Sequence, residues 1–301
     1  MSHFSVLVVG NNVDEQLLPY HEFECTGLDE YIVDVDETEK YLKDYEKHGE
    51  GKSPAEFVES WFGYRVLKYG ETPDITGDDK YGYACVDRDG NIKVINRTNP
   101  NAKWDYYTIG GRWSGFFRVK GGCLAMLQLS EALPDGYSKN RLPKKWIDFD
   151  YMQHEAQISA EEEYDAFIEA TNGVELIETW EEILAMHDNN DHAARSYWMN
   201  HPFTKALNTN MKYRYVWMLD SNIHERFFIG QPNARVSFAR RARSKAISTY
   251  AVVKDGEWYE KGRMGWWGIS SGDDPNWSSK FDELIKDLPE DTVLTIVDCH
   301  I

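Results

Sequence analysis

Cysteine is scarce in this chain, and the motifs in which cysteine and histidine carry known chemistry are missing. The 301 residues include four cysteines, no two of which form a C-x-x-C pair: Cys25, Cys85, Cys123 and Cys299. This spacing excludes a zinc knuckle and a thioredoxin-type redox motif. The chain also lacks H-E-x-x-H, a P-loop, and kinase or deaminase signatures. We therefore predict no cofactor and lean towards a protein that is not an enzyme.

Basic residues and long apolar runs are also under-represented. There are 33 Lys and Arg against 51 Asp and Glu, a net charge of −18, which disfavours a general affinity for nucleic-acid backbone. No apolar stretch is long enough to cross a bilayer, and no basic segment followed by an apolar run opens the chain. We expect a cytoplasmic protein that binds neither nucleic acid nor a membrane.

Large apolar side chains, by contrast, are abundant. Hydrophobic residues make up 42% of the chain and aromatic residues 14%, which is enough to close a core and argues against disorder. The runs 4–9 and 292–297 are apolar on both faces, so we expect both strands near the centre of one sheet. The predicted fold class is α+β, with a mixed or antiparallel sheet built from both chain ends and a helical insertion in the middle.

This pattern predicts three regions: an N-terminal α+β region over 1–150, a helical insertion over 151–210, and a C-terminal α+β region over 211–301 that completes the sheet. Within them, Ser53, Pro54 and Glu56 predict the start of a helix over 54–62.

Three further elements follow from local patterns. Strands 82–86 and 92–95 flank an Asp-Gly turn, which is typical of a hairpin. Ser159 is the expected N-cap residue of a central helix. Strands are expected over 213–229.

Charge is segregated along the chain. Residues 1–60 carry a net charge of −11, residues 155–191 contain 12 acids and no Lys or Arg, and residues 195–254 carry a net charge of +9. Opposed patches favour oriented docking or self-assembly, whereas the alternative is a solvated helix surface. The candidate partner-binding residues in these segments are Glu161, Glu162, Glu163, Arg240 and Arg241.

An aromatic segment over 99–113 combines rings with charged side chains and a Gly-Gly pair, and residues 262–268 have the same character. Such a combination suits a ligand pocket or an interface hot spot, although an aromatic strand with a glycine bulge is also ordinary core. The candidate partner- or ligand-binding residues here are Lys103, Trp104, Asp105, Arg112, Trp113, Trp266 and Trp267.

A third candidate lies at the ends of the chain. Asp298 and His300 stand two apart on the last strand and so project to one side, where His3 joins them if the terminal strands are neighbours. A carboxylate that orients one imidazole beside another is a general-base or metal arrangement. The alternative is a polar strand end, and no nucleophile motif accompanies the cluster.

Five segments spread over the chain carry a family resemblance. They are Met1–Gly10, Glu15–Gly27, Asn101–Asp105, Ile109–Trp113 and Asp298–Ile301. Through these segments the chain resembles a family of proteins encoded by tailed phages and prophages. The resemblance implies no particular chemistry. In size, acidity and phage setting it is also similar to anti-defence proteins that inhibit the Gabija system by encasing its nuclease complex.

Two functions follow from these observations. The first is a phage-encoded inhibitor of a host defence complex, which acts by protein–protein binding, covers a nucleic-acid-binding surface and forms a homo-oligomer in the host cytoplasm. The alternative is an enzyme or sequestering protein for a small nucleotide or sugar. In that case Trp104, Arg112 and Trp113 hold the ligand, and the polar cluster at the chain ends supplies acid–base or metal-ligating groups.

Overall fold

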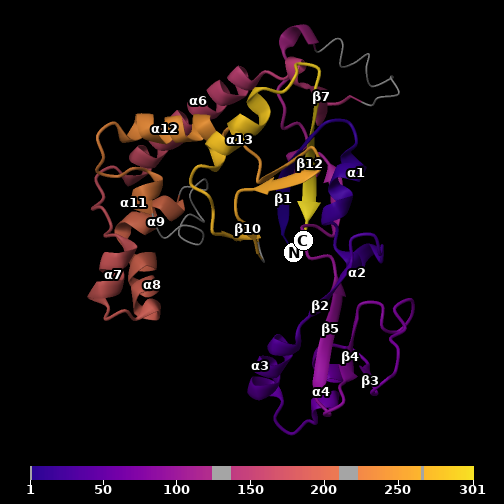
Figure 1. The fold of residues 1–301 in the computed structure, drawn as a ribbon. Helices are drawn as coiled ribbons and strands as arrows, with labels where there is room; N and C mark the ends of the chain where they lie inside the picture. The colour runs from indigo at the N-terminus through magenta and orange to yellow at the C-terminus, as the bar shows by residue number, and fades with distance from the viewer. Residues whose placement is uncertain (1, 124–136, 210–222, 266–267) are drawn as a thin grey trace. The chain divides into compact units, whose positions relative to one another are not determined.

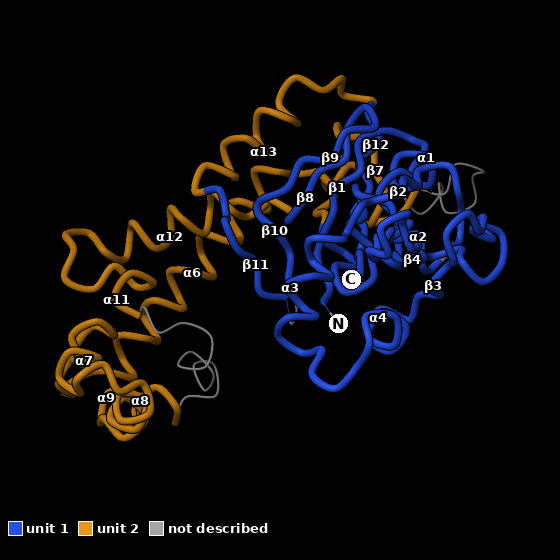
Figure 2. The backbone as a smooth tube through the Cα atoms, turned by 60° about the horizontal axis from the view of Figure 1, so that its bottom comes forward, with its two compact units in different colours: residues 1–116, 250–274, 292–301 blue, residues 117–249, 275–291 orange. Residues whose placement is uncertain are grey.

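The computed structural model describes residues 2–123, 137–209, 223–265 and 268–301 (Figure 1). It confirms the predicted α+β class, because mixed sheets include strands from both chain ends while helices occupy the middle. The chain forms two compact units (Figure 2). Unit 1 comprises 1–116, 250–274 and 292–301, and unit 2 comprises 117–249 and 275–291.

The main sheet of unit 1 contains the two terminal strands at its centre, as the sequence predicts. Its strand order is β6-β12-β1-β8-β9, with β1 antiparallel to β12 and parallel to β8. The bounds are β1 His3–Val9, β6 Tyr106–Ile109, β8 Ala251–Lys254, β9 Glu257–Glu260 and β12 Val293–His300. Because β1 and β12 pair over their full length, the two chain ends lie side by side (Figure 1).

One face of this sheet packs into a hydrophobic core. Phe4, Val6 and Val8 of β1 alternate into it, together with Val297 and Cys299 of β12. Three short helices follow β1 along the chain: α1 Val13–Leu17, the 3-10 turn η1 Leu18–Tyr20, and α2 Phe23–Thr26. A small hairpin of β10 Arg263–Met264 and β11 Ser270–Ser271 completes this part of the unit.

A second, four-stranded sheet lies in the same unit, in the order β2-β5-β4-β3. Its strands are β2 Val33–Asp36, β3 Val66–Leu67, β4 Gly82–Val86 and β5 Ile92–Thr98, and its helices are α3 Thr38–His48 and α4 Pro54–Trp61. The predicted capping box of Ser53 and Glu56 is present, and Phe57 and Val58 of α4 are fully buried against the sheet. The Asp-Gly hairpin joins β4 to β5 as predicted.

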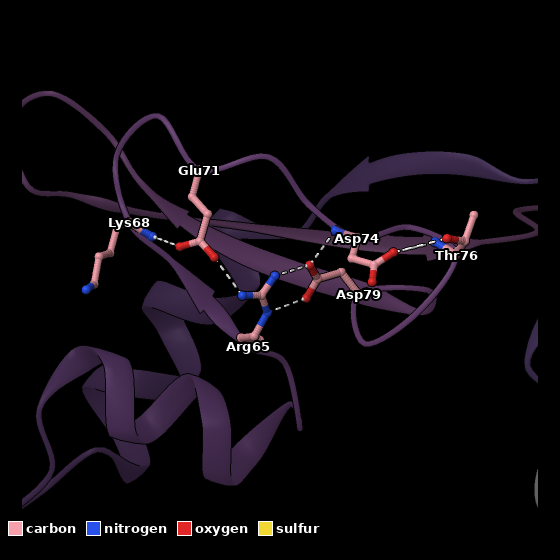
Figure 3. Close-up of polar contacts among 6 residues, drawn as sticks. All are labelled: Arg65, Lys68, Glu71, Asp74, Thr76 and Asp79. Carbon is pink, nitrogen blue, oxygen red and sulfur yellow. Dashed lines mark hydrogen bonds and ion pairs between the residues drawn. The ribbon is translucent and has the colours of Figure 1, made fainter.

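A charged cluster closes the loop between β3 and β4 (Figure 3). The Arg65 guanidinium donates to both carboxylate oxygens of the fully buried Asp79, at 3.1 and 2.7 Å, and to Glu71 at 2.6 Å. The backbone N–H of Asp74 donates to the same Asp79 carboxylate at 2.7 Å. These hydrogen bonds hold the pKa of Asp79 below its ordinary value, chiefly through Arg65.

Unit 2 is mainly helical. Its hydrophobic core includes Phe167, Phe227 and Phe238, in which Phe227 stacks on both other rings at centroid distances of 3.9 and 5.1 Å. The helices are α6 Phe149–Thr171, α7 Trp180–Met186, α8 Asp191–Asn200, α9 Pro202–Thr209, α11 Ile223–Arg226, α12 Ala234–Lys245 and α13 Trp277–Lys286. Short elements are η3 Gly121–Cys123, β7 Arg141–Pro143 and η4 Lys144–Trp146.

Several local predictions need correction. The central helix α6 begins at Phe149, where Asp148 accepts a hydrogen bond from the backbone N–H of Tyr151, so Ser159 lies inside the helix. Residues 223–226, expected in strands, are helical, because Ile223 and Phe227 turn into the helical core. The clearest of the expected strands there, 213–219, falls outside the described residues.

The helical region also differs in extent from the predicted insertion over 151–210. Unit 2 takes in 117–249 and 275–291, so α12 and α13 belong to it. None of the helices in the described ranges has the length and apolar character of a membrane span.

Candidate functional site

The register of three strands gathers polar side chains at one end of the main sheet. His300 of β12 is the direct partner of His3 on β1 and of Tyr106 on β6, and Asp298 is the partner of Ser5. Side chains of directly opposed residues lie on the same face of a sheet, and alternate residues of one strand share that face. The terminal strands are thus neighbours, which was the condition for His3 to join Asp298 and His300.

His3 and Asp298 form the first imidazole–carboxylate pair. His3 Nδ1 lies 2.8 Å from Asp298 Oδ1, and the backbone N–H of Arg112 donates to Asp298 Oδ2 at 2.9 Å. Both carboxylate oxygens are thus occupied, and Asp298 is only 5% exposed. A carboxylate that accepts from Nδ1–H fixes the imidazole in the tautomer whose Nε2 is free to exchange a proton.

His300 forms the second pair with a carboxylate from another strand. Its Nδ1 lies 2.7 and 2.8 Å from the two oxygens of Asp105, which also accepts from the backbone N–H of Tyr106 at 2.7 Å. His300 is 3% exposed, and its Nε2 is buried without a hydrogen-bond partner. The sequence correctly groups Asp298 with the histidines, but Asp298 orients His3, and Asp105 orients His300.

The two pairs contact each other through their rings. The imidazoles of His3 and His300 meet edge to face at a centroid distance of 4.8 Å, and Tyr106 stacks on His300 at 4.4 Å. The Tyr106 hydroxyl makes a long contact of 3.4 Å with His3 Nε2. His3 keeps 16% of its side chain exposed and Tyr106 is 49% exposed, so these two side chains are the parts of the cluster that a ligand can reach.

The chemistry open to this cluster is acid–base chemistry rather than thiol chemistry. Cys299 lies between Asp298 and His300 but faces the core, and burial raises the pKa of its thiol far above the ordinary value. Burial and the nearby Glu22 carboxylate also raise the pKa of Cys25. Both thiols are therefore protonated, and so poorly nucleophilic, near neutral pH.

Metal binding needs more ligands than the cluster offers. The described residues contain no group of three or more His, Cys, Asp or Glu side chains placed to hold a metal ion. Structural zinc sites take four protein ligands and catalytic ones three. The Nε2 atoms of His3 and His300 are two nitrogens, and both carboxylates are already bonded to the opposite edges of the rings.

Some residues of the predicted aromatic segment over 99–113 lie in the core, and others contact the histidine cluster. Trp104 is 5% exposed, stacks on His21 at 4.1 Å and donates its indole N–H to the Leu17 carbonyl, so it is a core residue. Lys103 pairs with Glu260 at 2.8 Å.

The end of that segment approaches the histidines. Trp113 is half-buried in the 3-10 turn η2 Gly111–Trp113, beside the exposed Arg112. Of the predicted candidates in the segment, Asp105 through its carboxylate and Arg112 through its backbone N–H therefore contact the polar cluster. Trp266 and Trp267 lie outside the described residues.

Two of the five charged candidates of unit 2, Glu161 and Glu163, pair with arginines of the basic segment. Arg235 on α12 bonds Glu161 at 3.0 Å and Asp165 at 2.8 Å, both on α6, and Arg226 lies 3.5 Å from Glu163. The acidic and basic segments of the sequence therefore meet within this unit.

Three other candidates of unit 2 differ in their surroundings. The Arg241 guanidinium lies 4.5 Å from the Phe228 ring centroid and donates to the Arg226 carbonyl. Glu162 and Arg240 are exposed.

Two features were missed at the sequence level. Tyr106 joins the cluster only through the pairing of β6 with β12, although its place in an aromatic strand was visible. Residues 268–272 read G-x-S-x-G, the spacing of a hydrolase nucleophile elbow. Ser270, however, lies in β11 opposite Met264, not at a strand-to-helix turn, so it lacks the context that this motif requires.

Comparison with known proteins does not extend this description. No protein-family model, curated protein or solved structure matches the chain.

Proposed function

We propose that the cluster at the paired chain ends is an acid–base site that acts on a small nucleotide or sugar. One observation carries the proposal: two imidazoles from opposite ends of the chain, each held at Nδ1 by its own carboxylate, meet at a centroid distance of 4.8 Å. A strand end that is merely polar does not need two oriented imidazole–carboxylate pairs.

In this proposal the two imidazoles have different roles. His3 is the catalytic residue, because its ring is partly exposed and its Nε2 can accept a proton from a ligand hydroxyl or return one. Asp298 positions His3. The buried His300, held by Asp105, packs against the His3 ring and fixes its place, as does Tyr106.

Turnover of a ligand panel tests the proposal. The purified chain is incubated with nucleotides and sugars, and products are followed by NMR for wild type, His3→Gln and His48→Gln. His48 is the matched control, because it is an exposed histidine of the same unit that lies at the end of α3 and stacks on Trp61. We expect His3→Gln to lower the rate about 10²- to 10⁴-fold and His48→Gln to leave it unchanged. Equal rates for both variants, or no turnover of any ligand, would overturn the proposal.

Inhibition of a host defence complex stays a second proposal. Its support is the aromatic content and the phage-family resemblance, since part of the segregated charge is paired within unit 2. Native mass spectrometry of the chain mixed with a purified Gabija nuclease complex tests it. A stoichiometric complex supports inhibition by binding, and separate masses at micromolar concentrations argue against it.

A further inference from the structure

The Gly110-Gly111 pair places an arginine beside the histidine cluster. Gly111 has φ +48°, and a Cβ added there would overlap the Cβ and Oδ2 atoms of Asp298. Glycine alone allows the turn η2 to approach this carboxylate so closely. The approach lets the N–H of the next residue, Arg112, bond to Asp298 Oδ2 while His3 bonds to Oδ1.

Arg112 is one of several described arginines whose guanidinium forms no ion pair. It is exposed, and in the described ranges no carboxylate pairs with it. Arg65, Arg97 and Arg235, in contrast, each pair with carboxylates. Arg88 and Arg240, like Arg112, form no ion pair among the described residues, so what distinguishes Arg112 is that its backbone N–H bonds the carboxylate that orients His3.

The carboxylates of the cluster do not compete for this guanidinium. Asp298 accepts from His3 and from the Arg112 backbone, and Asp105 accepts from His300 and the Tyr106 backbone. Their oxygens are turned towards protein donors. The groups left for a ligand are the partly exposed His3 ring, the Tyr106 hydroxyl and the Arg112 guanidinium. A guanidinium is a planar cation that matches phosphate with two parallel hydrogen bonds.

We infer that the site takes a phosphorylated ligand and that Arg112 binds its phosphate. The inference rests on the proposed function and narrows its ligand class to nucleotides or sugars that carry a phosphate group. Arg112 sets the specificity for phosphate, and His3 faces the adjacent part of the ligand. A bound phosphate is thus held next to the oriented imidazole rather than elsewhere on an acidic surface.

Calorimetric binding tests this assignment. Adenosine 5′-monophosphate, glucose 6-phosphate and inorganic phosphate are compared with adenosine and glucose, on wild type, Arg112→Ala and Arg88→Ala. Arg88 is the matched control, because it is an exposed arginine of the four-stranded sheet that bonds the Tyr69 hydroxyl. Circular dichroism and melting temperature confirm that each variant folds. Comparison of adenosine 5′-monophosphate with glucose 6-phosphate shows whether the site prefers a nucleotide or a sugar phosphate.

The expected result is binding of at least one phosphorylated ligand, weakened about 10- to 100-fold by Arg112→Ala and unchanged by Arg88→Ala. Equal affinity for a phosphorylated ligand and its unphosphorylated form, or no effect of Arg112→Ala, would overturn the inference. If turnover still falls in His3→Gln, the acid–base proposal survives the loss of this inference. Failure of every ligand to bind wild type would overturn both.

Discussion

His3 and His300 are direct partners across the central pair of strands, and their rings meet at an angle of 71°. Each imidazole is held by a carboxylate from a different part of the fold: Asp298 comes from β12, and Asp105 from the turn before β6. The cluster therefore depends on three chain segments, and its geometry is fixed by the pairing of the terminal strands. Changes to the carboxylates are expected to act on the imidazoles separately.

Asp298→Asn is expected to change the tautomer of His3. The asparagine amide has one oxygen, so it cannot accept from both His3 Nδ1 and the Arg112 N–H as the carboxylate does. Long-range ¹H–¹⁵N NMR of the imidazoles measures the populations of the two tautomers. We expect the neutral His3 ring to lose its preference for Nδ1–H, while His300 is unaffected.

The matched variant Asp105→Asn should do the reverse, because Asp105 bonds His300. If both variants perturbed both rings equally, the division of the cluster into two pairs would be wrong.

Gly111→Ala is expected to destabilise unit 1 by about 2–4 kcal/mol. The positive φ of +48° costs roughly 1–2 kcal/mol for alanine, and overlap with Asp298 adds a packing cost of about 1–2 kcal/mol. Urea unfolding of wild type and variant measures the difference.

Gly115→Ala is the control for backbone strain alone. Gly115 has φ +77°, but no atom lies within 4 Å of an added Cβ. We expect a loss of about 1–2 kcal/mol there. Equal losses at the two positions would show that the close approach to Asp298 carries no cost.

The Arg65–Asp79 pair predicts how stability responds to acid. The pKa of Asp79 is lowered in the folded state, chiefly by the Arg65 hydrogen bonds, whereas an unfolded Asp titrates near ~4. The unfolded state therefore binds more protons in this window, and the contribution of Asp79 is present above pH ~4 and lost as the pH falls through the folded pKa.

Unfolding free energies from pH 7 down to pH 3, for wild type and Asp79→Asn, measure this contribution. The variant should be less stable at pH 7 and lose less stability on acidification. If wild type and variant lost the same stability on acidification, Asp79 would not contribute to the pH dependence of the unfolding free energy.

Two simple periodicities sufficed to predict part of the chain-end cluster from the sequence, and left the approach of His3 conditional on the pairing of the terminal strands. Apolar character on both faces put β1 and β12 inside the sheet, and the two-residue alternation put Asp298 and His300 on one face. The partner of each imidazole was beyond that reasoning. It depends on the strand register and on Asp105, which a turn of the chain brings next to His300.

Helix α12 shows why the charged segments were harder to interpret. Its arginines look like a solvent-exposed basic surface in the sequence, but Arg235 bonds acids of α6 about seventy residues earlier. Likewise, serine is a residue type that favours the N-cap of a helix, yet α6 continues through Ser159 because Ala160 and Phe167 pack into the helical core. Local propensity was overridden by tertiary contacts in both cases.

Phe227→Ala is expected to cost about 3–5 kcal/mol of the stability of unit 2. The ring is fully buried and stacks between Phe167 and Phe238, so its removal leaves a cavity that two flat neighbours cannot close by small shifts. Val236→Ala on α12 is the control, because Val236 is 52% exposed and should change stability by less than about 0.5 kcal/mol. Hydrogen exchange of the unit 2 amides in the two variants measures both changes. A small loss for Phe227→Ala would mean that the three-ring stack does not hold this core together.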